Sequence, residues 1–205
     1  WQFTWYVPHD VKSLINLIGE RQFIDRLNAG FATSEKVSFN ALGDNMGAYP
    51  INHGNETNMQ AAYLFSYTSE PWHTQKWARA IQEKYYGMGP RDAYPGDEDQ
   101  GQMSSWYILS SIGLFQMDGG CSKDPVWLLG SPRFDRVEIL LDNTYYSGKK
   151  LIIKAENVSK DNCYIQYVRF NNKRLSNNYI EWSKLKKGGT LHFIMGDRPN
   201  PNAFK

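Results

Sequence analysis

The sequence predicts a chain that is mainly α-helical in its first part and β-stranded in its second part, and three observations lead to this fold class. Up to about residue 115, apolar residues recur at helical spacing between polar, glycine-rich loops. After Gly119-Gly120, short β-branched and aromatic runs alternate with Asn, Gly and Ser clusters, as in an antiparallel sheet. The length of 205 residues and the hydrophobic content of 41% allow one large domain or two modest ones.

The first part is predicted to be an array of helices. Asp10 is a suitable N-cap for a helix that runs to Ile18, and Pro71 is well placed in the first turn of another helix. Because the helices follow one another along the chain, their loops are expected to gather at one end. The predicted helices cover Asp10 to Ile18, Arg21 to Leu27, Thr57 to Tyr67, Pro71 to Tyr86 and Gly101 to Leu114.

The second part is predicted to be a small antiparallel β-sandwich-like domain. Glycines and a proline punctuate residues 118–132, so we assign residues 1–120 to the helical part and residues 121–205 to the β-sheet domain. The predicted strands cover Arg136 to Leu141, Lys150 to Glu156, Cys163 to Phe170 and Thr190 to Met195.

Composition excludes several classes of protein. The 23 basic and 21 acidic residues give a net charge of +2, far from the basic patch of a nucleic-acid-binding protein. Cys121 and Cys163 are too few for a disulfide framework, and no apolar run has the length of a membrane span. The chain opens on Trp1 without an initiator Met, so we expect it to start within a larger protein, and the lack of a signal segment is uninformative.

The loop Asn52-His53-Gly54-Asn55-Glu56 holds the first group of residues capable of site chemistry. Asn55 and Glu56 precede a predicted helix, where capping and compensation of the helix dipole would explain them. Gly54 also favours a binding role, because glycine lets the backbone approach a ligand closely or bend sharply. Both interpretations stay open from the residues alone.

The second loop, Pro95 to Ser104, contains the consecutive carboxylates Asp97, Glu98 and Asp99. Three adjacent negative charges repel one another, and the N-terminus of the following helix relieves this only in part. If the loop is extended, Asp97 and Asp99 point the same way and can surround one water. Such a pair fits the base side of glycoside hydrolysis with inversion, in which a second acid protonates the leaving oxygen. An exposed acidic turn is the alternative.

The residue types in these loops limit which metal could bind and whether a catalytic triad is expected. Oxygen ligands without a Cys-x-x-Cys motif or a spaced His pair favour calcium over zinc if a metal binds. His53, His73 and His192 are scattered and have no Ser or Cys partner in a nucleophile motif, so a hydrolase triad is not expected.

Several stretches, in this order, form a specific combination that covers nearly the whole chain. They are Trp1 to Asp10, Gly54-Asn55-Glu56, Pro71-Trp72 with Thr74-Gln75-Lys76, Gly96-Asp97-Glu98-Asp99 with Gly101-Gln102-Met103-Ser104, and Gly130-Ser131-Pro132. With them the sequence resembles glycoside hydrolase family 92, the calcium-dependent exo-acting α-mannosidases. The resemblance implies that the helical part belongs to an (α/α)6 barrel, with β-sandwich material before and after it.

The resemblance also implies roles for individual residues. Asp99 matches the general base, and Asp97 helps to hold or activate the water. Asn55 and Glu56 match the motif that lines the Ca²⁺ ion and the terminal mannose. Trp1 and Gln2 lie in a substrate-binding motif that follows the general acid. Calcium would contact sugar hydroxyls and help to distort the ring.

Two departures from the family pattern shape the expectations. The family's acid is a Glu a few residues before the Trp-Gln pair, so we expect the chain that begins at Trp1 to be inactive alone and to lack the N-terminal β-sandwich domain of its parent. The segment Thr57 to Gln60 replaces a His-containing sequence that α-1,2-specific members tend to show, which leaves α-1,3, α-1,4 and phosphodiester-linked mannose open. The expected partner is a mannose-containing oligosaccharide or glycoprotein glycan, and the expected location is secreted or periplasmic.

Two alternatives remain beside the mannosidase. One is a non-catalytic carbohydrate-binding or structural module, which the absence of the acid from this chain favours. The other is a different (α/α)6 enzyme, such as a trehalase-like hydrolase or a polysaccharide lyase. A lyase would need a Tyr/His or Arg cluster near the site, and the sequence offers none.

Overall fold

The computed structural model of the chain describes residues 1–41, 47–93, 95–96 and 98–205, which form two compact units. The first unit is Trp1–Ile108 and the second is Leu109–Lys205. The division falls inside the helix Gln102–Ser111, before the boundary at residue 120 that we predicted. The domain assignment itself stays a prediction.

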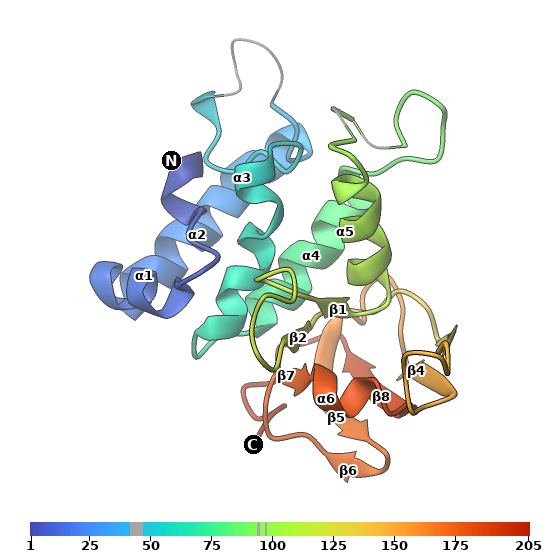
Figure 1. Cartoon of the computed structure of the whole chain (residues 1–205). Helices are drawn as coiled ribbons and strands as arrows, with labels where there is room; N and C mark the ends of the chain where they lie inside the picture. The colour runs from blue at the N-terminus through green and yellow to red at the C-terminus, as the bar shows by residue number, and fades with distance from the viewer. Residues whose placement is uncertain (42–46, 94, 97) are drawn as a thin grey trace. The chain divides into compact units, whose positions relative to one another are not determined.

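Unit 1 consists of helices (Figure 1). Its α-helices are α1 (Val11–Ile18), α2 (Glu20–Ser34), α3 (Glu56–Met59), α4 (Trp72–Lys84) and α5 (Gln102–Ser111), the last of which ends in unit 2. Its 3-10 helices include η1 (Gln2–Trp5), η2 (Glu35–Val37) and η4 (Ala61–Tyr67). The predicted cap of α1 is confirmed, since the Asp10 side chain accepts a hydrogen bond from the Ser13 amide at 3.1 Å.

The predicted continuous helix Thr57 to Tyr67 is wrong, because α3 stops after one turn and η4 follows it. The carbonyl of Thr57 accepts hydrogen bonds from the side-chain amides of Asn58, at 3.0 Å, and Gln60, at 2.9 Å. The Gln60 amide also reaches the Trp5 carbonyl, at 3.4 Å. Side-chain donors thus occupy a backbone acceptor that a continuous α-helix would use.

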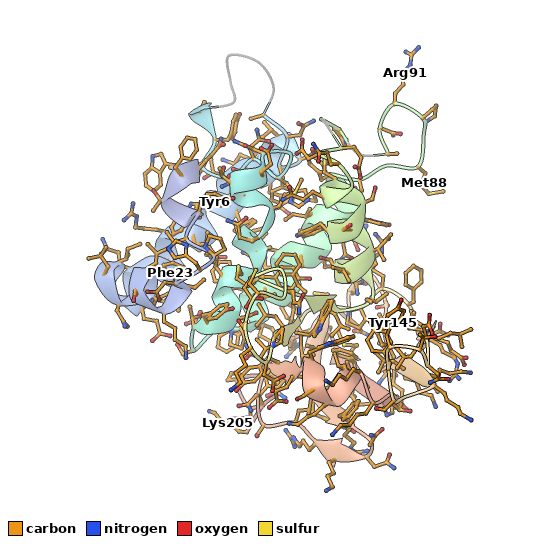
Figure 2. All side chains as sticks on the ribbon, viewed as in Figure 1. Tyr6, Phe23, Met88, Arg91, Tyr145 and Lys205 are labelled. Atoms are coloured by element: carbon orange, nitrogen blue, oxygen red, sulfur yellow. The ribbon has the colours of Figure 1, made fainter. Side chains whose placement is uncertain are left out.

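Aromatic rings fill the core of unit 1. Phe31 stacks on Trp77 with ring centroids 5.3 Å apart, and Trp5 meets Phe23 edge to face at 5.5 Å. These rings are buried, and Phe23 lies among the packed helices in Figure 2. Such pairs stabilise by about 0.5–1.5 kcal/mol beyond the burial of their area, so they fix how α2, α4 and η1 pack.

Unit 2 contains two sheets. The strand order is β1-β2-β7 in the first sheet and β3-β4-β8-β5-β6 in the second. The elements are β1 (Leu114–Phe115), β2 (Val126–Leu129), β3 (Arg136–Leu140), β4 (Lys150–Glu156), β5 (Tyr164–Phe170), β6 (Lys173–Arg174), β7 (Tyr179–Glu181), α6 (Trp182–Leu185) and β8 (Gly189–Gly196). The four predicted strands are confirmed as β3, β4, β5 and β8.

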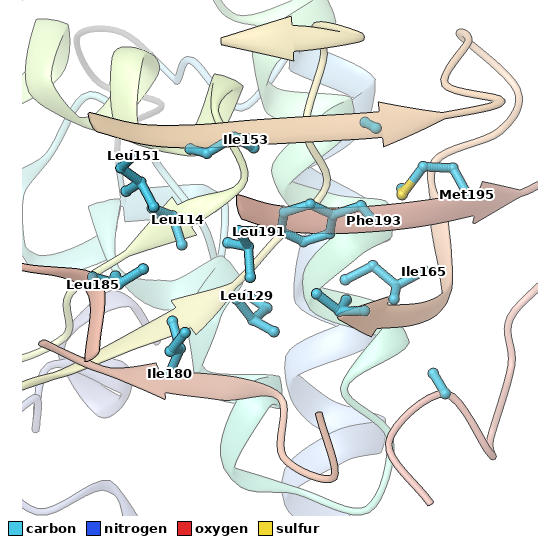
Figure 3. Close-up of a cluster of buried hydrophobic side chains, with 13 residues drawn as sticks. Leu114, Leu129, Leu151, Ile153, Ile165, Ile180, Leu185, Leu191, Phe193 and Met195 are labelled. Atoms are coloured by element: carbon cyan, nitrogen blue, oxygen red, sulfur yellow. The ribbon is translucent and has the colours of Figure 1, made fainter. Parts of the chain in front are cut away.

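The prediction of a purely antiparallel domain is wrong for one pair, because β4 and β8 run parallel. The chain reaches β8 only after β5, β6, β7 and α6, and this long return lets it enter the sheet in the direction of β4. The sandwich-like character agrees with the prediction. Side chains of both sheets share one core, in which Leu129 and Ile180 meet Ile153, Leu191 and Phe193 (Figure 3).

The described helices do not test the (α/α)6 barrel, which stays a prediction. Among the residues that the structure describes, no helix is both long and apolar enough to cross a bilayer.

Candidate active site

The two loops singled out in the sequence meet in unit 1, where the segments before α3 and α5 lie at the same end of the helices (Figure 1). Their contact is made of glycine backbone. A Cβ placed on Gly96 would lie 3.9 Å from the Gly54 carbonyl oxygen and 3.3 Å from the Tyr85 hydroxyl oxygen. A Cβ on Gly54 would overlap the same hydroxyl. The expectation that these loops gather is therefore met around Tyr85, the residue that follows α4.

In the first loop, the side chain of Gln2 ties the start of the chain to the Asn55 segment. Gln2 Oε1 accepts a hydrogen bond from Asn55 Nδ2 at 3.1 Å, and the Gln2 carbonyl accepts one from Asn58 Nδ2 at 3.0 Å. Asn58 Oδ1 in turn accepts from the Asn52 amide at 2.8 Å. Two predicted substrate-binding residues, Gln2 and Asn55, are thus direct neighbours in a hydrogen-bonded network.

The structure decides against simple capping for Asn55. It is the N-cap residue of α3, yet its side chain makes no capping hydrogen bond and binds Gln2 instead. Glu56 is exposed in the first turn of α3, and Trp1 is 65% exposed with the Arg26 guanidinium 5.0 Å above its ring. Asn55 therefore presents a polar side chain that does not cap the helix, whereas Glu56 in the first turn also fits compensation of the helix dipole.

In the second loop, Glu98 has a structural role. Its carboxylate accepts hydrogen bonds from the Gly101 amide, from the Ser104 hydroxyl and, at 3.1 Å, from the Ser104 amide. These contacts cap the N-terminus of α5, and the bond from the Ser104 hydroxyl is the main reason that the pKa of Glu98 is lowered. One of the three adjacent carboxylates is thus explained by the fold.

Asp99 is placed differently from Glu98. It is partly buried, and its backbone is left-handed with a φ of 54°, followed by Gln100 with a φ of 59°. Non-glycine residues seldom adopt this region, and those that do cluster at functional sites. Burial, and secondarily the charge of Asp99, raise the pKa of Tyr85, so Asp99 lies within electrostatic reach of the hydroxyl between the loops. Asp97 lies outside the described residues.

Sequence reasoning placed His53 in the first loop without giving it a role, and it missed Tyr85 and Tyr86. The His53 ring is fully buried, with Nε2 2.8 Å from the Tyr86 hydroxyl, and that hydroxyl lies 3.2 Å from the Met103 carbonyl at the start of α5. Burial lowers the pKa of His53 from 6.5 to about 3, so the ring is neutral. The available signals were the position of His53 inside the first loop and the tyrosine pair at the end of a predicted helix.

Asn55 and Glu56, the expected calcium ligands, offer oxygen atoms to a cation. Among the described residues, no three His, Cys, Asp or Glu side chains are grouped to hold a metal ion. Asn55 Nδ2 donates a hydrogen bond to Gln2, so Asn55 Oδ1 is the side-chain atom that can face a cation. The exposed carboxylate of Glu56 follows it in the chain. These hard oxygen donors fit calcium in type, and they would form part of a shell of about six to eight oxygens.

Comparisons with known proteins point to one family. The model of the glycosyl hydrolase family 92 catalytic domain matches residues 1–197. A family GH92 α-mannosidase from Bacteroides thetaiotaomicron, solved in complex with mannoimidazole, is 33% identical, with a TM-score of 0.84 over 100% of this chain and 26% of its own. An inverting GH92 mannosidase from the same organism is 31% identical, with a TM-score of 0.81 over 100% of this chain and 28% of its own.

A curated relative, an uncharacterized secreted glycosidase from Arthroderma benhamiae, is 29% identical over 96% of this chain and 23% of its own length. The chain thus spans about a quarter of the length of the proteins that it matches. The match to the family model nevertheless covers both units, including the two loops that meet at Tyr85. The chain belongs to glycosyl hydrolase family 92.

Proposed function

We propose that the protein containing this chain is an inverting, exo-acting α-mannosidase that removes terminal α-linked mannose from glycans, and that this chain supplies the base side of its active site. The observation that carries the proposal is the position of Asp99, a partly buried carboxylate on a left-handed turn beside the junction of the two loops. Identities of 31% and 33% to solved mannosidases of the family support the reaction class.

In the proposed mechanism, ionised Asp99 acts as the general base. It accepts a proton from a water that attacks the anomeric carbon, while the bond from that carbon to the glycosidic oxygen breaks. The leaving oxygen takes its proton from an acid on the opposite face, which we expect upstream of Trp1. Asp97 is proposed to help hold the same water. Because the water enters opposite the leaving group, an α-linkage gives β-mannose.

The Asn55 loop is proposed to bind the sugar. Asn55 and Glu56 would hold calcium, which when bound would polarise and orient sugar hydroxyls. Gln2 fixes the Asn55 amide through the 3.1 Å hydrogen bond, and so presents Asn55 Oδ1 away from itself. Trp1 offers an exposed aromatic face that suits the apolar face of a sugar ring.

The proposal is tested with the full-length protein that contains this chain. Mannose release from α-1,2-, α-1,3-, α-1,4- and α-1,6-linked mannobiosides is measured with calcium and after chelation, and the anomer released is followed by NMR. Release of β-mannose that stops on chelation and returns with calcium is expected. Mannose binding without release would move the case to a carbohydrate-binding module, and activity that survives thorough chelation would overturn the calcium requirement.

A variant pair tests the base. Asp99→Asn keeps the shape of the side chain and removes its basicity, so kcat should fall about 100-fold to about 10,000-fold. The matched control is Asp92→Asn, since the Asp92 carboxylate lies before the second loop and accepts a hydrogen bond from the Gly89 amide at 2.7 Å. Equal activities of the two variants would remove Asp99 from the mechanism.

Export is part of the proposal, because the relative from Arthroderma benhamiae is a secreted glycosidase by name. Fractionation of cells that express the full-length protein tests it. Activity confined to the cytoplasmic fraction would contradict export.

A further inference from the structure

Tyr85 occupies the place where the two site loops touch. Its side chain is 2% exposed, and its ring packs edge to face against His53 with centroids 4.9 Å apart. Its hydroxyl donates a hydrogen bond to the Pro95 carbonyl, immediately before Gly96. One side chain therefore contacts the first loop through His53 and the second loop through a backbone acceptor.

The Tyr85 hydroxyl explains why glycine stands at position 54. Gly54 does not have a positive φ, so its backbone conformation is open to other residues. A Cβ there would instead collide with the Tyr85 hydroxyl, while it would lie 3.4 Å from the Tyr85 Cζ and 3.5 Å from the Pro95 carbonyl oxygen. Only the hydroxyl oxygen prevents a methyl group from fitting.

The hydroxyl is also a permanent donor. Burial raises the pKa of Tyr85, and the nearby charge of Asp99 raises it further, so the proton stays on the oxygen throughout the physiological range. The bond to Pro95 is therefore present whenever the proposed base is ionised. A side chain that lost its proton within the physiological pH range would hold the two loops together only part of the time.

We propose that Tyr85 is a positioning residue for the reaction, whose hydroxyl sets the placement of the Asp99 turn relative to the Asn55-Glu56 segment. This inference rests on the proposed function. Asp99 and Asn55 come from loops that are far apart in sequence, and the base can act only if its oxygen lies within reach of the water beside the bound sugar. Tyr85 would set the position of Asp99 relative to Asn55 without touching the sugar.

Tyr85→Phe and Gly54→Ala, alone and together, test the proposal in the full-length protein. Tyr85→Phe keeps the ring against His53 and removes the bond to Pro95, so kcat should fall about 10-fold to about 100-fold while KM changes much less. Gly54→Ala should lower kcat as well, because its methyl displaces the hydroxyl. The double variant should be no worse than Tyr85→Phe alone, because the missing oxygen leaves room for the methyl. Tyr145→Phe, at an exposed tyrosine, is the control for the loss of a hydroxyl.

The outcomes separate this inference from the proposed function. A fall in melting temperature with unchanged kinetics in Tyr85→Phe would overturn positioning and leave a structural role. Losses that add fully in the double variant, in kcat and in melting temperature, would overturn the collision with the hydroxyl. If the wild type releases no mannose, the proposed function fails. The melting temperatures of the wild type, the two single variants and the double variant would then still decide whether the hydroxyl joins the loops.

Discussion

Replacing His53 by phenylalanine should remove a pH dependence of stability that the fold builds into unit 1. The folded protein buries a neutral imidazole whose pKa is lowered from 6.5 to about 3. As the pH falls below 6.5, His53 becomes protonated in the unfolded chain but stays neutral in the folded chain down to about pH 3. Stability is therefore lost across this window as the pH falls. At about 1.4 kcal/mol per pKa unit, the loss from pH 6.5 to pH 5 is about 2 kcal/mol.

The assay is denaturation by urea, followed by tryptophan fluorescence at pH 7, 6 and 5, for the wild type and His53→Phe. The variant carries a constant cost, because the bond between His53 and Tyr86 is gone, so the slopes with pH are compared rather than the absolute values. His73, whose pKa is also lowered by burial, titrates in both proteins and cancels in the difference. His9→Phe, at an exposed histidine, is the control for replacing an imidazole by a phenyl ring. Parallel curves for wild type and His53→Phe would refute the reasoning.

Three further predictions concern contacts that stabilise unit 1 or unit 2. Tyr86→Phe should cost about 1–3 kcal/mol, measured by urea denaturation, because it removes the partner of buried His53, and combining it with His53→Phe should recover part of that cost. Glu98→Ala should speed hydrogen exchange of the Ser104 amide, and the wild-type amide should lose protection only as the pH falls through the lowered pKa of Glu98, below 4.5. Phe193→Ala should destabilise unit 2 by about 3–5 kcal/mol, because Phe193 is fully buried between the two sheets, whereas a calorimetric shift no larger than that of an exposed-site variant would contradict this.

The parts of the fold that were predictable from sequence depend on local signals. The cap at Asp10 and the apolar spacing of α1 are contained in nine consecutive residues, and the structure confirms both. At the interruption between α3 and η4, the Gln60 side chain also reaches the Trp5 carbonyl, 55 residues away. No periodicity in the window Thr57 to Tyr67 carries that contact.

The same distinction holds for unit 2. Strands of five or more residues gave a clear pattern, whereas β1 and β6 have two residues each and are defined only by their partners. The parallel pair of β4 and β8 follows from the order of strands in space, which a single sequence does not contain.

For the candidate site, polar loops were easier to recognise than the residues that hold them. Asn55 and Asp99 stand out because polar and acidic groups are concentrated around them. His53 was considered only as a member of a hydrolase triad. Tyr85 and Tyr86 resemble ordinary helix residues, because an aromatic ring that packs and an aromatic hydroxyl that positions a loop look the same in sequence. Gly54 was interpreted through backbone freedom, and the structure shows that the Tyr85 hydroxyl occupies the space that a Cβ at this position would need.

The acidic run illustrates how neighbouring carboxylates can be used for different purposes. Glu98 points back onto the start of α5, where the Ser104 amide and hydroxyl and the helix dipole stabilise its charge. Asp99 has a left-handed backbone conformation that costs about 1 kcal/mol or more. Its charge adds to burial in raising the pKa of Tyr85. If both carboxylates were structural, Glu98→Gln and Asp99→Asn would each loosen α5. If Glu98 is structural and Asp99 is the base, Glu98→Gln loosens α5, whereas Asp99→Asn leaves the amide protection of α5 intact while activity is lost.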